Sequence, residues 1–271
     1  MVTLFKKDLI SQKRKSSKGN QLKWRDGDIW YKADYAGYEG LSEYLVSHLL
    51  RHSDLQPEEY TLYELEEISY GSRIFRGVRS KNFLPEGWQL ITLERLFRSV
   101  HGRSFAWDLY GISDHKNRLR YLVDQVVQMT GLKDFGIYMN RLLTIDALFL
   151  NEDRHMHNIA VLLDDNGGYH YCPMFDHGAA LLSDTTLEYP MGEDIYQLMD
   201  RVKPKTFLQA FDEQLEISEE LYGSHLVFSF DKKTVRKLLG QAGIYGEDMI
   251  YRVETILYEQ MRRYGPYFRS S

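Results

Sequence analysis

Residues 151–158 read Asn151-Glu152-Asp153-Arg154-His155-Met156-His157-Asn158, a polar segment that leads directly into an apolar hairpin. The hairpin consists of two runs, 159–163 and 169–173, around the turn sequence Asp164-Asp165-Asn166-Gly167-Gly168. A second polar segment follows it, Phe175-Asp176-His177-Gly178. Because a hairpin brings its two ends side by side, we expect Asp153, Asn158 and Asp176 to converge on one point.

Two carboxylates and one amide form a side-chain set that suits phosphoryl transfer. The Asp153 carboxylate is predicted to orient a hydroxyl nucleophile and accept its proton, and the oxygens of Asn158 and Asp176 are predicted to hold Mg²⁺. The step of five residues from Asp153 to Asn158 is the spacing of a protein-kinase catalytic loop. His155 is predicted to support this loop rather than to react. The alternative is that Asp153 and Asn158 only cap a helix or a turn.

The first ninety residues show mainly the period of β-strands. Runs 21–24 and 29–32 flank the hairpin turn Arg25-Asp26-Gly27-Asp28, and runs 60–68 and 73–82 predict a second strand pair. Between them, Leu41, Leu45 and Leu49 predict a short amphipathic helix that begins at Ser42-Glu43. A strand lysine, Lys32, followed by a helix glutamate, Glu43, is the arrangement that holds nucleotide phosphates in kinases. A surface lysine and a solvated glutamate are the alternative.

From about Leu90 the apolar period becomes helical. The expected helices carry Leu93, Leu96, Phe97 and Val100, then Leu119, Leu122 and Val126, and continue over 135–150 and 247–264. The sequence therefore predicts an α+β, bilobal protein-kinase-like fold. Its small β-rich N-terminal lobe would span 1–89 and bind the ATP phosphates. Its larger helical catalytic lobe would span 90–271 and contain a lone hairpin in its middle. A ligand is expected between the lobes.

Composition excludes several classes of protein. The 271 residues carry a net charge of −5, which disfavours general nucleic-acid binding. One cysteine, Cys172, fits a reducing compartment. The longest purely apolar run, 159–163, is far shorter than the roughly 18 residues of a membrane helix, and we find no secretory signal. The sequence favours a cytoplasmic protein that has no direct nucleic-acid partner and no membrane partner.

Several segments, in order along the chain, resemble the HipA-like serine/threonine kinases of bacteria. Ser16-x-x-Gly19-x-Gln21-x-Lys23 is similar to that family's phosphate loop, Lys32 to its nucleotide-binding lysine, and Ser42-Glu43-Tyr44 to the start of its partner helix. Asn151-x-Asp153-Arg154-His155-x-x-Asn158 resembles its catalytic loop. Phe175-Asp176-His177-Gly178 resembles its metal loop, which usually has Asn where His177 stands. Fifteen residues precede Ser16, so the resemblance indicates the short, kinase-core form.

This resemblance implies an ATP- and Mg²⁺-dependent kinase that phosphorylates Ser or Thr of a protein substrate. Ser16, Gly19, Gln21 and Lys23 would bind the ATP phosphates together with Lys32 and Glu43. The adenine is expected near the segment after the strand 73–82, with Phe83 or Leu84 packing on it. In the family, a serine of the phosphate loop can be autophosphorylated, which switches the enzyme off, and Ser16 is the matching position. Many members are toxins paired with a DNA-binding antitoxin, so an antitoxin protein is an implied partner.

Three other functions stay open at the level of sequence. His155-x-His157, His170-x-Cys172 and His177 suggest a zinc site. The chain would otherwise be a non-catalytic pseudokinase that serves as a partner-binding scaffold, or a kinase of lipid or small-molecule hydroxyls. Segment 183–211, with Thr185, Thr186 and Lys203-Pro204-Lys205, is the candidate for acceptor choice.

Overall fold

The computed structural model describes residues 1–10 and 21–269, so the predicted phosphate-loop residues Ser16 and Gly19 lie outside the described part of the chain. The chain forms two compact units. Unit 1 comprises Met1–Phe83, Phe175–Val202 and Val227–Ser271, and unit 2 comprises Leu84–Met174 and Lys203–Leu226. Unit 1 thus combines the predicted β-rich region with two later stretches. The lobe boundary between residues 89 and 90 stays a prediction.

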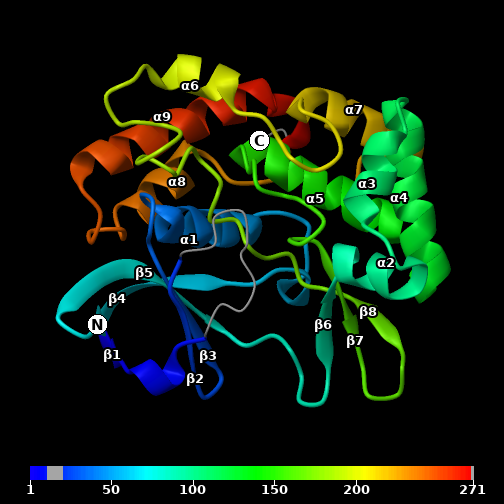
Figure 1. Ribbon diagram of the computed structural model, residues 1–271. Coiled ribbons are helices and arrows are strands. Elements are labelled where there is room, and N and C mark those ends of the chain that lie inside the picture. The colour runs from blue at the N-terminus through cyan, green and yellow to red at the C-terminus, as the bar shows by residue number, and fades with distance from the viewer. Residues whose placement is uncertain (11–20, 270–271) are drawn as a thin grey trace. The chain divides into compact units, whose positions relative to one another are not determined.

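Unit 1 contains a five-stranded sheet with the order β1-β4-β5-β3-β2 (Figure 1). Its strands are β1 (Val2–Leu4), β2 (Lys23–Asp26), β3 (Ile29–Ala33), β4 (Tyr63–Tyr70) and β5 (Arg73–Lys81). Both predicted hairpins are present, and each turn has a glycine in the left-handed region, Gly27 with φ 57° and Gly71 with φ 61°. The parallel pairing of β1 with β4 was not predicted, because three residues carry too little alternation to identify a strand.

Helix α1 (Glu39–Leu50) packs against β4 and β5 (Figure 1). Helix α8 (Lys232–Leu239) packs against α1 and α9 (Glu247–Arg263), and α6 (Ile195–Arg201) packs against α9. Short 3₁₀ turns occur at Lys6–Asp8, Pro57–Glu59 and Gly265–Tyr267. Every residue from Gly40 to Leu50 is buried, so the expectation of an amphipathic helix is wrong: α1 lies between the sheet and α8 and is enclosed on both sides.

The start of α1 also differs from the expectation. The helix begins at Glu39, three residues before Ser42. The Glu39 carboxylate accepts hydrogen bonds from the N–H groups of Ala36 at 2.7 Å and Gly37 at 3.1 Å, which fixes the loop that enters the helix. Ser42 lies inside the helix and is buried, and its hydroxyl donates to the carbonyl of Ala180 at 3.0 Å. Ser42 therefore attaches α1 to the segment after the candidate metal loop instead of capping it.

Strand β3 presents its residues alternately to the two faces of the sheet. Tyr31 and Ala33 belong to a buried apolar cluster on one face, which also contains Leu4, Trp24 and Ile68. Lys32 lies between them in sequence and therefore points to the other face, where its side chain meets Glu43 of α1. The period of the strand thus delivers one lysine to the helix-covered face.

Unit 2 is built around α5 (Phe135–Phe149), which packs against α4 (His115–Thr130) and α7 (Phe211–Tyr222). Helices α2 (Leu93–His101) and α3 (Phe105–Gly111) pack against each other and against α4. Strands β6 (Gln89–Thr92), β7 (Ala160–Leu163) and β8 (Tyr169–Tyr171) form an antiparallel sheet (Figure 1). Within the described residues, no helix is long and apolar enough to cross a membrane.

Two expectations for unit 2 are wrong. The hairpin β7–β8 is not alone, because residues 89–92, near the expected start of the helical region, form β6 and pair with β7. A short apolar run does not distinguish a strand from a buried helix, and the pairing decides it. Val100, expected on the apolar face of α2, is 60% exposed near the C-terminal end of that helix.

Substituting Leu45 by Ala is expected to destabilise unit 1, because Leu45 is fully buried in α1. Leu→Ala changes at such positions cost about 2–5 kcal/mol, which would lower the midpoint of urea unfolding followed by circular dichroism. Leu187→Ala is the matched control, since Leu187 is 76% exposed, and it should change stability by less than about 0.5 kcal/mol. Equal midpoints for the two variants would contradict the enclosed position of α1.

Candidate active site

Lys32 on β3 lies between two carboxylates. Its Nζ is 2.6 Å from Oε1 of Glu43 on α1 and 2.9 Å from Oδ1 of Asp176, which follows β8 in the chain. Nζ is also 5.1 Å from the ring centroid of Tyr63 and 3.4 Å from its hydroxyl. Burial by itself lowers the pKa of Lys32, but the carboxylates of Asp176 and Glu43 outweigh it and hold that pKa well above its usual value. Lys32 is thus a permanently charged cation within a buried network.

Glu43 connects this cation to the candidate metal loop. Its Oε2 accepts the main-chain N–H of His177 at 2.9 Å, while its Oε1 faces Lys32. Asp176 has a φ of 63°, in the left-handed region that side-chain-bearing residues rarely adopt. Such strain persists only where the surroundings determine the backbone, and it concentrates at functional sites. The contacts of Lys32 with Asp176 and of Glu43 with His177 hold the backbone of Asp176 in this conformation.

A second lysine lies beside the first. Lys23 on β2 is directly opposite Lys32 on β3, so both side chains lie on the same face of the sheet. The Asp176 carboxylate raises the pKa of Lys23, but burial and the charge of Lys32 together bring that pKa below its usual value. Two lysines therefore share the two carboxylates of Glu43 and Asp176. The two ammonium groups and the two carboxylates balance in charge, and the lysines place two cations on one face of the sheet.

The segment 151–158 in unit 2 is a tight turn held by its own hydrogen bonds. The side-chain amide of Asn158 donates to the carbonyl of Asp153 at 2.7 Å, and the N–H of His155 donates to the same oxygen at 3.1 Å. Asp153 is buried, and its Oδ1 lies 3.4 Å from Nζ of Lys205. The D-x-x-x-x-N spacing thus corresponds to a loop in which the amide closes the turn that carries the carboxylate.

A buried ion pair between Arg154 and Asp146, here called the Asp146–Arg154 brace, supports this turn. Arg154 donates through Nε to Oδ2 of Asp146 at 2.9 Å and through Nη2 to Oδ1 at 3.1 Å, and both side chains are only 1% exposed. Asn151 donates to the same carboxylate at 2.7 Å, and Nη1 of Arg154 donates to the carbonyl of Asn158 at 3.2 Å. Asp146 on α5 therefore fixes both ends of the segment 151–158. This bidentate geometry is specific to arginine and carboxylate.

The remaining predicted site residues lie as follows. The Phe83 ring packs on Phe175, the first residue of the candidate metal loop, with a centroid distance of 5.7 Å. Gln21 lies two residues before β2. The half-buried imidazole of His155 contacts that of His157 edge to face at 5.6 Å. The adenine role of Phe83, the phosphate role of Gln21 and the supporting role of His155 stay predictions.

Comparison with known proteins identifies the fold. No protein-family model and no curated protein matches the chain. Among solved structures, the chain is similar to the Helicobacter pylori proinflammatory kinase CtkA, with 17% identity over 90% of both chains and a TM-score of 0.60. It is also similar to a structure of the Shewanella oneidensis MR-1 HipA–HipB toxin–antitoxin system with its operator DNA, with 13% identity, 95% of this chain and 67% of that chain covered, and a TM-score of 0.52.

The fold is that of the HipA-like kinases. The expected α+β, kinase-like fold class and the resemblance to the HipA-like kinases are therefore both confirmed. At these levels of identity the likeness concerns the fold, and the roles of individual residues have to be argued from their surroundings.

The zinc alternative has no support within this HipA-like fold. Across residues 1–10 and 21–269, no three or more His, Cys, Asp and Glu side chains gather as a metal site. His170 instead bonds the Asp164 carboxylate at 2.8 Å and stacks on Trp88 at 4.4 Å. Cys172 is buried, and burial raises the pKa of its thiol far above the usual value, which disfavours the thiolate that zinc requires.

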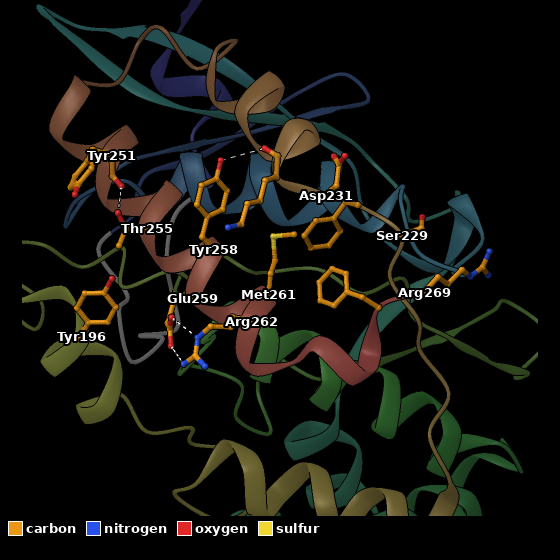
Figure 2. Close-up of a pocket in the computed structure, with 13 residues that line it drawn as sticks. Tyr196, Ser229, Asp231, Tyr251, Thr255, Tyr258, Glu259, Met261, Arg262 and Arg269 are labelled. Carbon is orange, nitrogen blue, oxygen red and sulfur yellow. Dashed lines mark hydrogen bonds and ion pairs between the residues drawn. The ribbon is translucent and has the colours of Figure 1, made fainter. Parts of the chain in front are cut away.

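A large hollow in unit 1 lies apart from the predicted residues. It has a volume of about 980 Å³ and is lined by α9 and by residues 229–232, with Tyr196 and Arg269 at its margins (Figure 2). None of the described residues that we predict to act on a nucleotide lines it. Figure 2 shows Arg262 paired with Glu259, and the hydroxyl of Tyr258 is directed back to the main chain of Lys232. Several polar side chains of the hollow are thus already engaged in hydrogen bonds within unit 1.

Sequence reasoning missed four parts of the site. It did not foresee the direct contact of Lys32 with Asp176, the Asp146–Arg154 brace, the hydroxyl of Tyr63 or the contact of Lys205 with Asp153. Each of these contacts forms between residues that are separated in sequence, or requires a particular direction of a side chain, and neither can be deduced from residue spacing. The sequence does predict one half of the brace: Asp146 is a carboxylate within an apolar helix, which indicates a buried structural acceptor rather than a ligand, and the structure confirms it. Its partner Arg154 was not foreseen.

Replacing Arg154 by Met is expected to destabilise unit 2 strongly. The change leaves the buried Asp146 carboxylate without its bidentate partner, and breaking a buried pair in this way costs about 3–5 kcal/mol. Chemical denaturation would measure the loss. Arg262→Met is the control, because its pair with Glu259 has a 75% exposed arginine and should contribute at most about 1 kcal/mol. A loss at Arg154 as small as that at Arg262 would contradict the brace.

Asp34, in the loop between β3 and α1, gives unit 1 a dependence on pH. Its carboxyl accepts from the N–H of Gly40 at 2.6 Å and from the hydroxyl of Tyr245 at 2.9 Å. Burial, assisted by the charge of Glu39, raises the pKa of Asp34 to about 7 from 3.8. Between these values the folded chain binds more protons at Asp34 than the unfolded chain, so its contribution to stability is present at low pH and is lost as the pH rises through about 7.

Asp34→Asn should remove this component. The unfolding free energy of the wild type relative to Asp34→Asn is therefore expected to decrease as the pH rises from about 4 to about 7. Urea titrations at closely spaced pH values would measure it. Parallel curves for the two proteins across that range would show that Asp34 has no raised pKa in the folded chain.

Proposed function

We propose that this chain is an ATP- and Mg²⁺-dependent serine/threonine protein kinase of the HipA-like type. The observation that carries the proposal is the position of Lys32, at 2.6 Å from Glu43 and 2.9 Å from Asp176. A strand lysine held by a helix glutamate, next to an aspartate that can bind metal, is the set of groups that kinases use to hold nucleotide phosphates. The likeness in fold to CtkA and HipA supports the same assignment.

Lys32 would supply the cation for the ATP phosphates, and Glu43 would keep its ammonium group in place. Lys23 adds a second positive charge on the same face of the sheet. Gln21 precedes Lys23 in the predicted phosphate loop, and Phe83 would cover the adenine ring. Ser16 and Gly19 belong to the same proposed loop but lie outside the described residues.

The chemistry of Asn158 and Asp176 fits a magnesium ion. The side-chain nitrogen of Asn158 donates to the main-chain carbonyl of Asp153. The side-chain oxygen of Asn158 is therefore directed elsewhere and can serve as a metal ligand. Asp176 supplies carboxylate oxygens. Mg²⁺ prefers a few protein oxygens and completes its shell with phosphates and water, so two such residues suffice. The bound ion would neutralise charge on the phosphate oxygens.

Asp153 would orient the serine or threonine hydroxyl of the substrate. In the proposed reaction the hydroxyl oxygen bonds to the γ-phosphorus, the bond from that phosphorus to the β,γ-bridging oxygen breaks, and ADP leaves. The proton of the hydroxyl passes to the Asp153 carboxylate. The hydrogen bonds of Asn158 and the Asp146–Arg154 brace would keep the carboxylate in position, and His155 would support the same loop.

The resemblance to the HipA-like kinases also suggests how this chain is regulated and which partners it has. We propose that phosphorylation of Ser16 in the phosphate loop would inhibit the kinase, because a dianionic phosphate would repel the phosphates of ATP. The structure of the Shewanella system contains HipA with HipB and operator DNA. An antitoxin protein is accordingly proposed as a partner of this chain, and a Ser/Thr protein as its substrate, in the cytoplasm.

Two alternatives make different predictions. A pseudokinase scaffold would bind a partner without transferring phosphate, and its melting temperature would not change with ATP and Mg²⁺. A lipid or small-molecule kinase would transfer phosphate, but to no protein in a lysate. The buried charge network around Lys32 favours catalysis over a scaffold, because a scaffold does not need a lysine shared by two carboxylates.

Asp153→Asn and Asp176→Asn are each expected to lower phosphate transfer by at least about 100-fold, because each removes a carboxylate that would act on the reacting groups. The measurement is transfer of label from γ-³²P-ATP, with Mg²⁺, to the proteins of a cell lysate and to casein. Asp165→Asn is the matched control, an exposed aspartate in the turn of the β7–β8 hairpin. Addition of EDTA should abolish transfer by the wild type.

Transfer by Asp176→Asn at the wild-type rate would refute the metal assignment. Absence of transfer by the wild type, combined with no thermal shift in ATP and Mg²⁺, would refute the kinase proposal in favour of a scaffold. Circular dichroism of each variant would establish that the fold is retained.

A further inference from the structure

Lys205 contacts the carboxylate of Asp153, although it follows that residue by 52 positions. Its Nζ lies 3.4 Å from Oδ1 of Asp153. The side chain of Asp153 is 10% exposed, whereas that of Lys205 is 42% exposed. The ammonium group thus reaches a nearly buried carboxylate from the solvent side. Both residues belong to unit 2.

The main chain around Lys205 is attached to the catalytic loop and to the helices of unit 2. The N–H of Lys205 donates to the carbonyl of Glu152, the residue before Asp153, at 3.0 Å. Two residues later, the carbonyl of Phe207 accepts from Arg118 on α4 at 2.5 Å, and the N–H of Phe207 donates to Gln214 on α7 at 3.1 Å. Phe207 is fully buried. The segment is therefore held on both sides of Lys205, and the lysine approaches Asp153 from a fixed point.

The ion pair between Lys205 and Asp153 adds little to the free energy of unfolding. A partly exposed ion pair contributes little to folding, so a structural role alone does not account for a lysine placed in this way. A carboxylate that has to aim one oxygen at a hydroxyl, however, gains from a cation that fixes its other oxygen, because small errors of position slow phosphoryl transfer considerably.

We infer that Lys205 is a positioning residue of the phosphotransfer reaction, which holds the Asp153 carboxylate in the orientation that accepts the substrate hydroxyl. This inference rests on the proposed kinase function and deepens it. Lys205 acts through Asp153, so its contribution belongs to the transition state and not to the binding of ATP. The role also assigns a function to segment 203–207, which follows α6 and lies against the catalytic loop through the Lys205–Glu152 bond.

Lys205→Met tests this inference with labelled ATP and casein. The expected result is a fall in kcat of about 10- to 100-fold with the KM for ATP unchanged within about twofold, because only the alignment of the hydroxyl is lost. Lys205→Arg keeps a cation and should recover most of the lost rate. Lys133→Met is the matched control, an exposed lysine of unit 2 outside the predicted site, with wild-type kinetics expected.

A double-mutant cycle with Asp153→Asn separates positioning from a merely structural role. If Lys205 acts through the carboxylate, Lys205→Met should cause no further loss of the residual single-turnover rate in the Asp153→Asn background. A structural role would give additive losses. The thermal midpoint of Lys205→Met should stay within about 4 °C of the wild type, since an exposed pair contributes little.

The outcomes are distinguishable from those of the kinase proposal. Wild-type transfer combined with equal kcat values for Lys205→Met and Lys133→Met would overturn the inference and leave the kinase proposal standing. A raised KM for ATP at unchanged kcat would also overturn it, because Lys205 would then bind the nucleotide. Absence of any transfer or ATP-dependent thermal shift in the wild type would overturn the kinase proposal and the inference with it.

Discussion

The arrangement of unit 1 depends on the ammonium group of Lys32. A charged lysine enclosed by a sheet and a helix is tolerated only when carboxylates surround it, because removal of a cation from water costs several kcal/mol. Glu43 and Asp176 meet this requirement from two segments that are far apart in sequence. The need to neutralise one charge thereby ties β3, α1 and the loop after β8 together. The same contacts place a metal-binding type of side chain next to a phosphate-binding type.

A comparable constraint organises the segment 151–158 of unit 2. Asp146 lies fully buried on α5, and its carboxylate accepts hydrogen bonds from Asn151 at the start of the loop and from Arg154 in its middle. Burial raises the pKa of Asp146, and its hydrogen-bonded partners oppose that effect. In each unit, then, a buried charge of one sign is satisfied by partners on another segment. Within the residues described, four residues other than glycine have a left-handed backbone. Leu150 directly precedes the segment 151–158, Asp176 lies within the candidate metal loop, and Leu181 and Leu182 follow that loop closely.

Much of the fold could be predicted because its signals are local. The hairpin at Gly27 follows from turn chemistry, and α5 follows from apolar spacing over fifteen residues. Strand β6 and the enclosed character of α1 could not be predicted, since each depends on what packs against the segment. In the site, the Lys32–Glu43 pair followed from strand-then-helix order, whereas the Lys32–Asp176 contact required the return of a segment 144 residues away.

The sequence by itself determined the main hairpins and helices, the kinase-like class and the identity of the chemical groups, because these depend on residue type and short spacing. Only the tertiary structure decided which charges neutralise one another: Lys32 with Asp176, Arg154 with Asp146, and Lys205 with Asp153. The physical reason is that an ion pair depends on distances of a few ångströms in space. Distance along the chain carries no such information until the chain has folded.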